Sequence, residues 1–374
     1  SEETIGDIDI LTIAKDREKV ARFVTSLPGI EQILGQGDTK VSVLLQSGIQ
    51  VDVRMIEEKN YGAALQYFTG SKEHNVELRA YAKGRNFKVS EYGIFKVEGD
   101  KETFIAGKTE EELYKTLGMD FIPPELRQAS GEIEAALRHQ LPQLIESKDI
   151  RGDLHVHSTW SDGHDSIEAM AKAADKLGYE YIAISDHSPS LAIAQGPKTK
   201  ADILRKKKEI EDVQKKVSVK VLCGTEVDIL ADGKLDYPDD VLKEMDIVIA
   251  AIHSGFGKDN TERLLKAIEH PLVHAIAHPT GRHLGQRQAY PFDEEKVFKR
   301  AAETGTWLEI DGQPTRLDLP YGMCRKAKKM GVKFILSSDA HSTGSLRYMD
   351  LGVSTARRGW LTKEDVINAQ ETLF

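Results

Sequence analysis

Cysteine and long apolar runs are both scarce in this sequence, and their scarcity narrows what the protein can be. Its 374 residues include two cysteines, Cys223 and Cys324, in unrelated contexts. This excludes a disulfide framework and a zinc ribbon and fits a cytoplasmic protein. No apolar stretch is long enough to span a bilayer, so we expect no membrane association. The composition, 40% hydrophobic and 30% charged, is typical of a globular chain of two or three domains.

The chain also lacks an excess of positive charge. It has 51 Lys and Arg against 60 Asp and Glu, a formal net charge of −9, which argues against broad nonspecific attraction to nucleic acid. A nucleic-acid enzyme is not excluded, because a carboxylate-rich metal site adds acids that bound divalent ions offset. The chain opens with SEETIGDIDIL, without a methionine, and we expect a fragment that lacks the N-terminal part of a longer protein.

The first 150 residues change character several times. Residues 7–60 alternate or run apolar between glycine-rich breaks and predict strands. Residues 61–85 have a helical pattern that the letters TGS interrupt. Residues 86–135 mix short strands with helices, and 132–149 predict a helix followed by a linker.

From residue 151 onward the pattern is regular. Seven strand-like runs alternate with amphipathic helical stretches such as 166–178 and 292–305. The runs are GDLHVHS, YEYIAISDH, VKVLCGTEVDI, DIVIAAIHS, VHAIAHPT, TWLEIDG and KFILSSDAHS. Nearly continuous apolar strands that alternate with helices indicate a parallel sheet covered by helices. Seven units in about 220 residues favour a closed or nearly closed β/α barrel, with a doubly wound open sheet as the alternative.

Histidines and acids gather at the ends of these runs. In RGDLHVHSTWSDG, His155 and His157 would point to one face of a strand, and Asp162 follows five residues later. Further residues of this kind end later runs: His187, Glu226, His253, His278, Asp339 and His341. The carboxyl ends of barrel strands converge on one rim, so we expect all nine side chains to share one small volume.

The alternative interpretation of the nine is a set of independent structural histidines and helix-capping acids, recurring at one end of the strands by chance. We assign that structural role to the histidines outside the pattern, which are His74, His139, His164, His270, His274 and His283. Nine imidazole and carboxylate ligands are too many for one ion and predict a cluster of two or three. Such ligands suit Zn²⁺, Mn²⁺ or Fe²⁺. Closely spaced ions of this kind promote phosphoester hydrolysis.

The motifs HVHSTWSDG, SDHS, GTEVDI, AAIHSG, AHPTGR and SSDAHS resemble, in this order, those of the PHP (polymerase and histidinol phosphatase) family of metal-dependent phosphoesterases. The resemblance covers residues 151–360 and implies three metal positions. The first would be held by His155, His157, Glu226 and Asp339. Glu226 would bridge to the second, held by His253 and His278. The third would be held by Asp162, His187 and His341. Arg282, in HPTGR, is a candidate for phosphate binding.

The front third of the chain carries a second carboxylate pattern. Asp7 and Asp9 form a D-x-D pair on one strand face, and Asp52 lies on an expected neighbouring strand. Together they could complete a three-carboxylate cluster of the kind that holds two Mg²⁺ ions for phosphoryl or nucleotidyl transfer. A purely structural role is the alternative for the D-x-D pair.

The stretch YFTGSKEHNVELR, residues 67–79, places aromatic residues beside a glycine at a helix break, where they could stack on a base and sugar. Asn75 and Arg79 lie one turn apart on a shared helix face. Five basic residues make the surface around this stretch locally positive: Lys72, Arg79, Lys83, Arg85 and Lys88. A solvated helix face would give the same charges, so both interpretations stay open.

GDIDIL, VDVR, YFTGS and SEYGIF together resemble the palm and thumb of family X DNA polymerases, followed by a PHP domain as in bacterial and archaeal repair polymerases of that family. The resemblance implies that Asp7, Asp9 and Asp52 bind the Mg²⁺ ions of the polymerase. It implies contacts to the incoming dNTP from Tyr67, Phe68, Gly70 and Asn75. It implies contacts to DNA from Lys72, Arg79 and Lys83.

The expected organisation is an α/β chain of four segments. They are a partial α+β nucleotidyltransferase-type palm over 1–60, a thumb over 61–135, a linker helix over 136–150 and a seven-stranded (β/α) PHP barrel over 151–374. The N-terminal DNA-binding domain, the fingers, the start of the palm and a final C-terminal helix are missing from the pattern. We therefore expect little primer extension by this chain.

The resemblance implies a family X repair polymerase joined to a Mn²⁺- or Zn²⁺-dependent 3′–5′ exonuclease. Its partners would be dNTPs and DNA in the form of gaps, primer–templates or 3′ ends, and we expect a monomer. Two alternatives stay open. One is a small-molecule phosphatase of the histidinol-phosphate type, and the other is a catalytically silent PHP scaffold for the polymerase.

Overall fold

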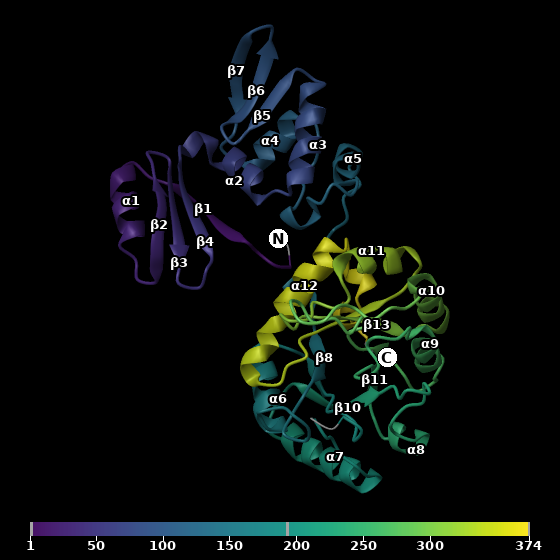
Figure 1. Cartoon of the computed structure of the whole chain (residues 1–374). Coiled ribbons are helices and arrows are strands. Elements are labelled where there is room, and N and C mark those ends of the chain that lie inside the picture. Colours follow the sequence, from purple (N-terminus) through teal and green to yellow (C-terminus); the bar gives the residue numbers. More distant parts are fainter. Residues whose placement is uncertain (1–2, 192–193, 373–374) are drawn as a thin grey trace. The chain divides into compact units, whose positions relative to one another are not determined.

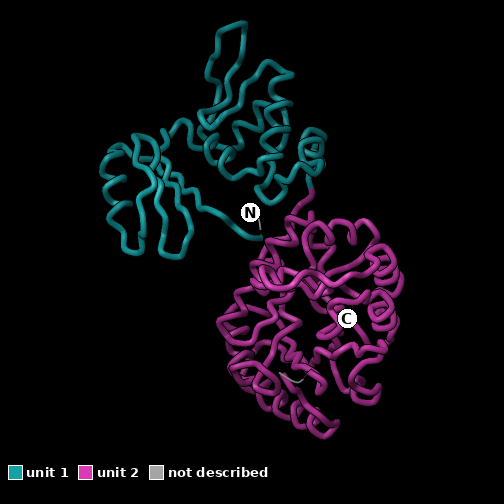
Figure 2. Tube along the Cα trace, in the orientation of Figure 1, with its two compact units in different colours: residues 1–141 teal, residues 142–374 magenta. Residues whose placement is uncertain are grey.

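The computed structural model describes residues 3–191 and 194–372 and divides the chain into two compact units, residues 1–141 and 142–374 (Figure 2). Each unit has its own sheets and its own core (Figure 1). Within the described ranges, no helix is both long and apolar enough to cross a membrane.

Unit 1 begins with a four-stranded sheet that one helix covers. The strand order is β1 (Asp7–Ile13), β4 (Gln50–Ile56), β3 (Lys40–Leu45) and β2 (Ile30–Gln36), with β1 and β4 parallel and the other pairs antiparallel. Helix α1 (Arg17–Thr25) packs Ala21 and Val24 against alternating valines of β3 and β4. The parallel register sets Asp9 beside Asp52. Because side chains alternate along a strand, both carboxylates lie on the face opposite α1.

The rest of unit 1 is a group of helices around a three-stranded sheet. The elements are α2 (Tyr61–Thr69), α3 (Lys72–Lys83), β5 (Phe87–Ser90), β6 (Gly93–Glu98), β7 (Lys101–Ala106), α4 (Glu110–Thr116) and α5 (Glu132–Leu137). The predicted helical region with a break at TGS is confirmed, since Ser71 caps α3 by accepting a hydrogen bond from His74 N at 3.2 Å. The His74 ring is buried, with Nδ1 2.7 Å from Glu132 Oε1, which confirms its structural role.

A linker helix over 136–150 is wrong. Helix α5 ends at Leu137, and the next helical element is one 3-10 turn, Ser147–Asp149. The reason is His139, whose φ of 57° turns the chain out of the helix while Gln140 N caps it by donating to Ala135 O at 2.8 Å.

Unit 2 is built on a seven-stranded parallel sheet, which confirms the prediction. Its strands neighbour one another in chain order: β8 (Gly152–Val156), β9 (Tyr181–Ile184), β10 (Lys220–Asp228), β11 (Ile247–Ala251), β12 (Ala275–Ile276), β13 (Trp307–Asp311) and β14 (Phe334–Ser337). The helices around it are α6 (Ile167–Lys176), α7 (Lys200–Gln214), α8 (Asp239–Leu242), α9 (Thr261–Ile268), α10 (Glu294–Thr304), α11 (Tyr321–Lys329) and α12 (Met349–Arg358) (Figure 1). This alternation of strand and helix follows the predicted order.

Side chains of these strands belong to two separate apolar clusters. In β9, Ala183 packs in a cluster formed by strand residues, whereas Ile182 and Ile184 pack in the cluster that includes the helices. Both faces of the strand are therefore buried in apolar surroundings. This is why the strands read as continuous apolar runs instead of alternating with polar residues.

The first and last strands close the sheet into a near-barrel without a full ladder between them. Val156 pairs with Ala340 beyond the end of β14. At the opposite end of β8, the Asn368 side chain bridges the two strands. It donates to Gly152 O at 2.8 Å and to Leu336 O at 2.7 Å, and it accepts from Leu336 N at 3.0 Å. One fully buried amide thus replaces hydrogen bonds that a continuous ladder would make.

We expect Asn368→Ala to destabilise unit 2. The change leaves buried backbone groups without partners, so the free energy of unfolding should fall by about 2–4 kcal/mol. Trp160, Trp307 and Trp360 are the three tryptophans of the chain and all belong to unit 2. Urea unfolding followed by tryptophan fluorescence therefore reports on this unit. Gln370→Ala is the control, because the Gln370 amide donates only to carbonyls close in the chain. Equal losses in the two variants would contradict the closing role of Asn368.

Candidate metal centre

Nine histidine, aspartate and glutamate side chains meet at the carboxyl ends of the barrel strands. His155 lies in β8 and Glu226 in β10, and the other seven follow the ends of β8, β9, β11, β12 and β14. The structure brings together all nine residues singled out in the sequence: His155, His157, Asp162, His187, Glu226, His253, His278, Asp339 and His341. They converge because the carboxyl ends of parallel barrel strands lie on one rim. We refer to these nine residues as the histidine–carboxylate cluster.

Glu226 lies at the centre of this cluster. Its carboxylate is buried, with 1% of the side chain exposed, and has ring nitrogens of five histidines around it. The distances are 2.7 Å to His278, 2.8 Å to His187, 3.2 Å to His253, 3.3 Å to His155 and 3.6 Å to His157. One carboxylate is therefore placed to serve more than one ion.

Two aspartates complete the cluster on either side of His157. Asp339 Oδ1 lies 3.1 Å from His157 Nε2. Asp162 Oδ2 lies 3.2 Å from His341 Nε2 and 3.6 Å from His187 Nε2. The ligand atoms of three groups lie within 4.8 Å of one another: His155, His157 and Glu226; His187, Glu226 and His253; and His157, Asp162, His187 and His341.

Acids that no sequence pattern singled out orient two of the rings. Glu309 Oε1 lies 2.6 Å from His155 Nδ1, and Asp228 Oδ1 lies 2.6 Å from His253 Nδ1. A partner at Nδ1 fixes the ring orientation and leaves Nε2 for the cluster. Both acids stand in quoted strand runs, TWLEIDG and GTEVDI. The sequence of one strand does not show which residue of a neighbouring strand its carboxylate contacts. Neither acid could therefore be identified from the sequence as a partner of a cluster histidine.

The charges of the cluster compensate one another. Burial acts to raise the pKa of Glu226, but the positive charges of His187 and His253 hold it well below its ordinary value. Burial, together with the charge on His187, lowers the pKa of His157 to about 4. His157 is therefore neutral at pH 7, which is the form in which imidazole binds a metal ion.

The donor set fits divalent metal ions. His157 Nδ1 and His253 Nε2 are buried and have no hydrogen-bond partner in the described part of the chain. Buried polar atoms nearly always have a partner, and a metal ion would supply one. Imidazole and carboxylate ligands suit Zn²⁺, Mn²⁺ or Fe²⁺.

A guanidinium reaches the cluster from a position that the sequence did not indicate. The Arg316 side chain is 13% exposed, and its Nε lies 3.5 Å from Asp339 Oδ2 and 3.4 Å from Asp311 Oδ2. Arg282, the candidate for phosphate binding, donates from its guanidinium to the backbone carbonyls of Arg316 and Leu317. Arg282 thus supports the segment that carries Arg316. Arg316 stands in the connection between β13 and α11, where no repeated pattern marks it.

In unit 1 the candidate polymerase acids lie beside two basic side chains. Arg54 joins two of them, with Nε 3.0 Å from Asp9 Oδ1 and Nη2 3.3 Å from Asp52 Oδ2. Lys40 Nζ lies 3.1 Å from the same oxygen of Asp52. Asp7 is exposed on the same strand face as Asp9. A metal ion that binds between Asp9 and Asp52 must therefore displace Arg54.

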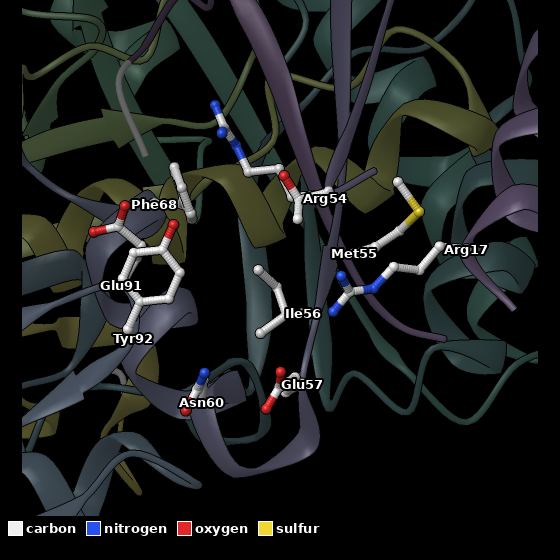
Figure 3. A pocket seen from close by; sticks show the side chains of 10 residues that line it. Arg17, Arg54, Met55, Ile56, Glu57, Asn60, Phe68, Glu91 and Tyr92 are labelled. Carbon is white, nitrogen blue, oxygen red and sulfur yellow. The ribbon is translucent and has the colours of Figure 1, made fainter. Parts of the chain in front are cut away.

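Phe68, one of the candidate nucleotide contacts, lines a pocket of about 190 Å³ in unit 1 (Figure 3). Side chains lining it include Arg17, Arg54, Asn60, Phe68 and Tyr92. The Arg54 guanidinium carbon lies 4.1 Å from the centre of the Phe68 ring, and Tyr67 packs edge-on against Phe68. Asn75 accepts a hydrogen bond from Gln66 Nε2 at 2.7 Å and donates to Tyr67 O at 2.8 Å. Its amide is thus engaged within the unit.

The remaining candidates in unit 1 lie around α3. Gly70 separates α2 from α3 and has φ of 74°, in the region that favours glycine. Lys72, Arg79 and Lys83 are exposed on α3. The structure therefore leaves these three cations accessible to a charged partner.

A buried lysine supports the metal centre. Lys206, on α7, is 1% exposed, and its Nζ lies 2.9 Å from Asp186 Oδ2. It also donates to Ile184 O at 2.8 Å and to Gly224 O at 3.1 Å. Asp186 in turn accepts from Ser158 N at 2.7 Å. The Lys206–Asp186 pair therefore connects the ends of β8, β9 and β10.

We expect Lys206→Met to lower the free energy of unfolding by about 3–5 kcal/mol, because it leaves the Asp186 carboxylate buried without its counter-charge. Lys207→Met is the control in the next position. Lys207 makes a partly exposed ion pair with Glu244 at 3.3 Å, and its loss should cost less than about 1 kcal/mol. Urea unfolding of both variants gives the comparison. If the two lysines contribute equally, the support role of Lys206 is wrong.

Comparison with known proteins gives matches in both units. Residues 64–128 match the DNA polymerase beta thumb, and residues 153–303 match the PHP domain. The chain is 42% identical, over 98% of its length, to the DNA polymerase/3′-5′ exonuclease PolX of Bacillus subtilis (strain 168). It spans 65% of the length of that relative.

Two further matches involve phosphatases. A protein of Thermoanaerobacter sp. (strain X514) described as a probable phosphatase is 31% identical, over 58% of this chain and 89% of its own length. A solved structure of histidinol phosphate phosphatase from Lactococcus lactis, complexed with zinc, L-histidinol and phosphate, is 15% identical with a TM-score of 0.40. That match covers 55% of this chain and 93% of the other.

Proposed function

We propose that this chain, which belongs to the family X DNA polymerases with a PHP domain, trims 3′ ends of DNA by hydrolysing phosphodiester bonds at its histidine–carboxylate cluster. The observation that carries the proposal is the buried Glu226 carboxylate with ring nitrogens of five histidines within 3.6 Å. The exonuclease named in the Bacillus subtilis relative supports the same reaction.

The nine cluster residues would hold two or three Zn²⁺ or Mn²⁺ ions, and the central Glu226 carboxylate would serve more than one of them. Ions bound in this way lower the pKa of a water and stabilise the attacking and leaving oxygens of the phosphodiester. Glu309 holds His155 Nε2 towards the cluster through its contact to Nδ1. Arg316 brings a positive charge to the same place and can contact a phosphate oxygen.

We propose that unit 1 carries the polymerase site. The Mg²⁺ ligands are Asp7, Asp9 and Asp52. The dNTP contacts are Tyr67, Phe68, Gly70 and Asn75, and the DNA contacts are Lys72, Arg79 and Lys83. The shared face of Asp9 and Asp52 and the exposure of α3 support these roles. Arg54 forms ion pairs with both Asp9 and Asp52. These pairs would keep the two carboxylates in place until a Mg²⁺ ion replaces the guanidinium.

A small-molecule phosphatase is the competing function. Relatives described as probable phosphatases match over 58% of the chain. Hydrolysis of a phosphomonoester without degradation of an oligonucleotide would favour this alternative. The match to the polymerase thumb and the 98% coverage by a polymerase relative favour the nuclease.

The first test concerns metal content. We expect purified protein to carry more than one ion per chain, because one carboxylate and five rings cannot all serve a single tetrahedral ion. Chelation should lower the melting temperature, since ions that bind only the folded state stabilise it by about 2.7 kcal/mol at a hundredfold excess over Kd. Elemental analysis and thermal melting measure both. Asp52→Asn should leave the zinc or manganese content unchanged, whereas one ion or fewer per replete chain contradicts the cluster.

The second test separates the two units. Replacing Glu226 by Gln should reduce 3′-end trimming by more than about 100-fold, because loss of an outer partner alone lowers activity by about 10–100-fold. Replacing Asp52 by Asn should leave trimming within about twofold of the original rate, since Asp52 holds no ion of unit 2. The measurement is degradation of an end-labelled oligonucleotide with Mn²⁺. The reverse order of sensitivity would assign the nuclease to unit 1.

A further inference from the structure

An arginine stacked on an aromatic ring lies at the rim of the barrel beside the metal centre. Phe256 follows the cluster residue His253 by three positions in the connection after β11. The Arg287 guanidinium carbon lies 3.7 Å from the centre of the Phe256 ring. Phe256 also packs on Tyr290, with ring centroids 6.4 Å apart and an interplanar angle of 26°. We call these three residues, Phe256, Arg287 and Tyr290, the rim stack.

Backbone contacts hold Arg287 in this position. His283 and Arg287 exchange both of their backbone hydrogen bonds at 2.8 Å, which closes a tight turn. Arg287 Nε also donates to Gly281 O at 2.8 Å. Gly281 has φ of +60°, and a Cβ there would lie 2.6 Å from the Tyr290 ring. Only a glycine lets the turn approach the rings this closely, so a larger residue at this position would displace the Tyr290 ring.

The turn of the rim stack is connected to the segment that carries Arg316. Leu284 N donates to Thr315 O at 2.7 Å, which joins the turn of Arg287 to the segment that carries Arg316. Burial and, after it, the positive charge of Arg316 lower the pKa of Arg287. Arg316 in turn lies 3.5 Å from the cluster residue Asp339. Among residues 3–191 and 194–372, Arg287 has no carboxylate partner in an ion pair. The Arg287 guanidinium is thus placed by the Phe256 ring and by Gly281 O.

We propose that the rim stack binds a nucleobase of the DNA strand being trimmed, with the base stacked on the Arg287 guanidinium. Bases of single strands are recognised in this way on aromatic rings and on arginine planes. The adjoining phosphate would lie towards Arg316, whose guanidinium reaches the cluster residue Asp339. The inference rests on the proposed nuclease function and adds to it a contact that a small phosphoester lacks. The rim stack would therefore give the site its preference for nucleotide chains over small phosphoesters.

The experiment compares oligonucleotides with and without a base at one position. Single-stranded 3′ ends carry a tetrahydrofuran abasic residue at the last, second or third nucleotide, and the matching strand has all its bases. Affinity is measured by fluorescence anisotropy with Ca²⁺ in place of Mn²⁺, and trimming is measured separately with Mn²⁺. For the unmodified protein, removing the base at the contact position should weaken binding by about 5- to 150-fold, as for loss of one stacked base.

Arg287→Ala should weaken binding of the full strand by a similar factor and leave binding of the abasic strand unchanged. Arg287→Lys keeps the positive charge but loses the planar guanidinium on which a base can stack. Its affinity for the full strand should therefore be close to that of Arg287→Ala. Arg325→Lys is the matched control, because Arg325 covers the Trp360 ring at 4.0 Å on the helical layer of the same unit. Thermal melting of each variant checks that the fold is intact.

Two outcomes of the binding measurements overturn the inference. One is an equal preference for bases in the protein and in Arg287→Ala, and the other is full affinity in Arg287→Lys, which would show a charge contact without stacking. Trimming reports on the proposed function independently. If the protein binds the base through Arg287 but cleaves no strand, the nuclease fails and the rim stack stands. If it trims full and abasic strands alike, the nuclease stands and the rim stack fails.

Discussion

The carboxylate of Glu226 has almost no contact with water, and a buried charge is stable only when opposite charges or donors surround it. One or two strands cannot supply enough such partners. Five histidines from different strand ends do so, because the parallel sheet brings all its carboxyl ends to one rim. The orienting acids behind His155 and His253 then become necessary, since each ring must present a particular nitrogen. Much of unit 2 is arranged to satisfy this one buried group.

The two units neutralise their carboxylates with different kinds of side chain. In unit 1, Asp9 and Asp52 lie near a surface and are neutralised by Arg54 and Lys40. These side chains are long and partly exposed, so they can move away when an ion arrives. In unit 2, imidazole rings fixed on strand ends surround Glu226, and imidazole is a side chain of the kind that divalent metal ions accept as a ligand. The first arrangement suits a hard ion that exchanges with substrate, and the second suits ions that stay bound.

Much of the fold and of the metal centre could be predicted from the sequence because both follow short periods. Apolar runs separated by helices specify the parallel sheet. A histidine or acid at the end of a run is therefore placed at the carboxyl end of a strand, on the same rim as the others. Glu309, Arg316 and Asn368 could not be found in this way. Each acts on a partner more than twenty residues away, through contacts that depend on which strands become neighbours. The linker helix was wrong for a local reason, since the left-handed conformation of His139 ends the helix three residues before Pro142.

The closing contact of the barrel also sets an order of events in time. Asn368 binds the backbone of Gly152, 216 positions earlier in the chain. During synthesis at about 5–20 residues per second, strand β8 is made many seconds before its closing partner leaves the ribosome. Throughout that interval β8 has one unpaired edge, and the pocket of acids and imidazoles remains incomplete. Asp339 and His341 follow that last strand, so the complete set of nine side chains can assemble only at the end of synthesis.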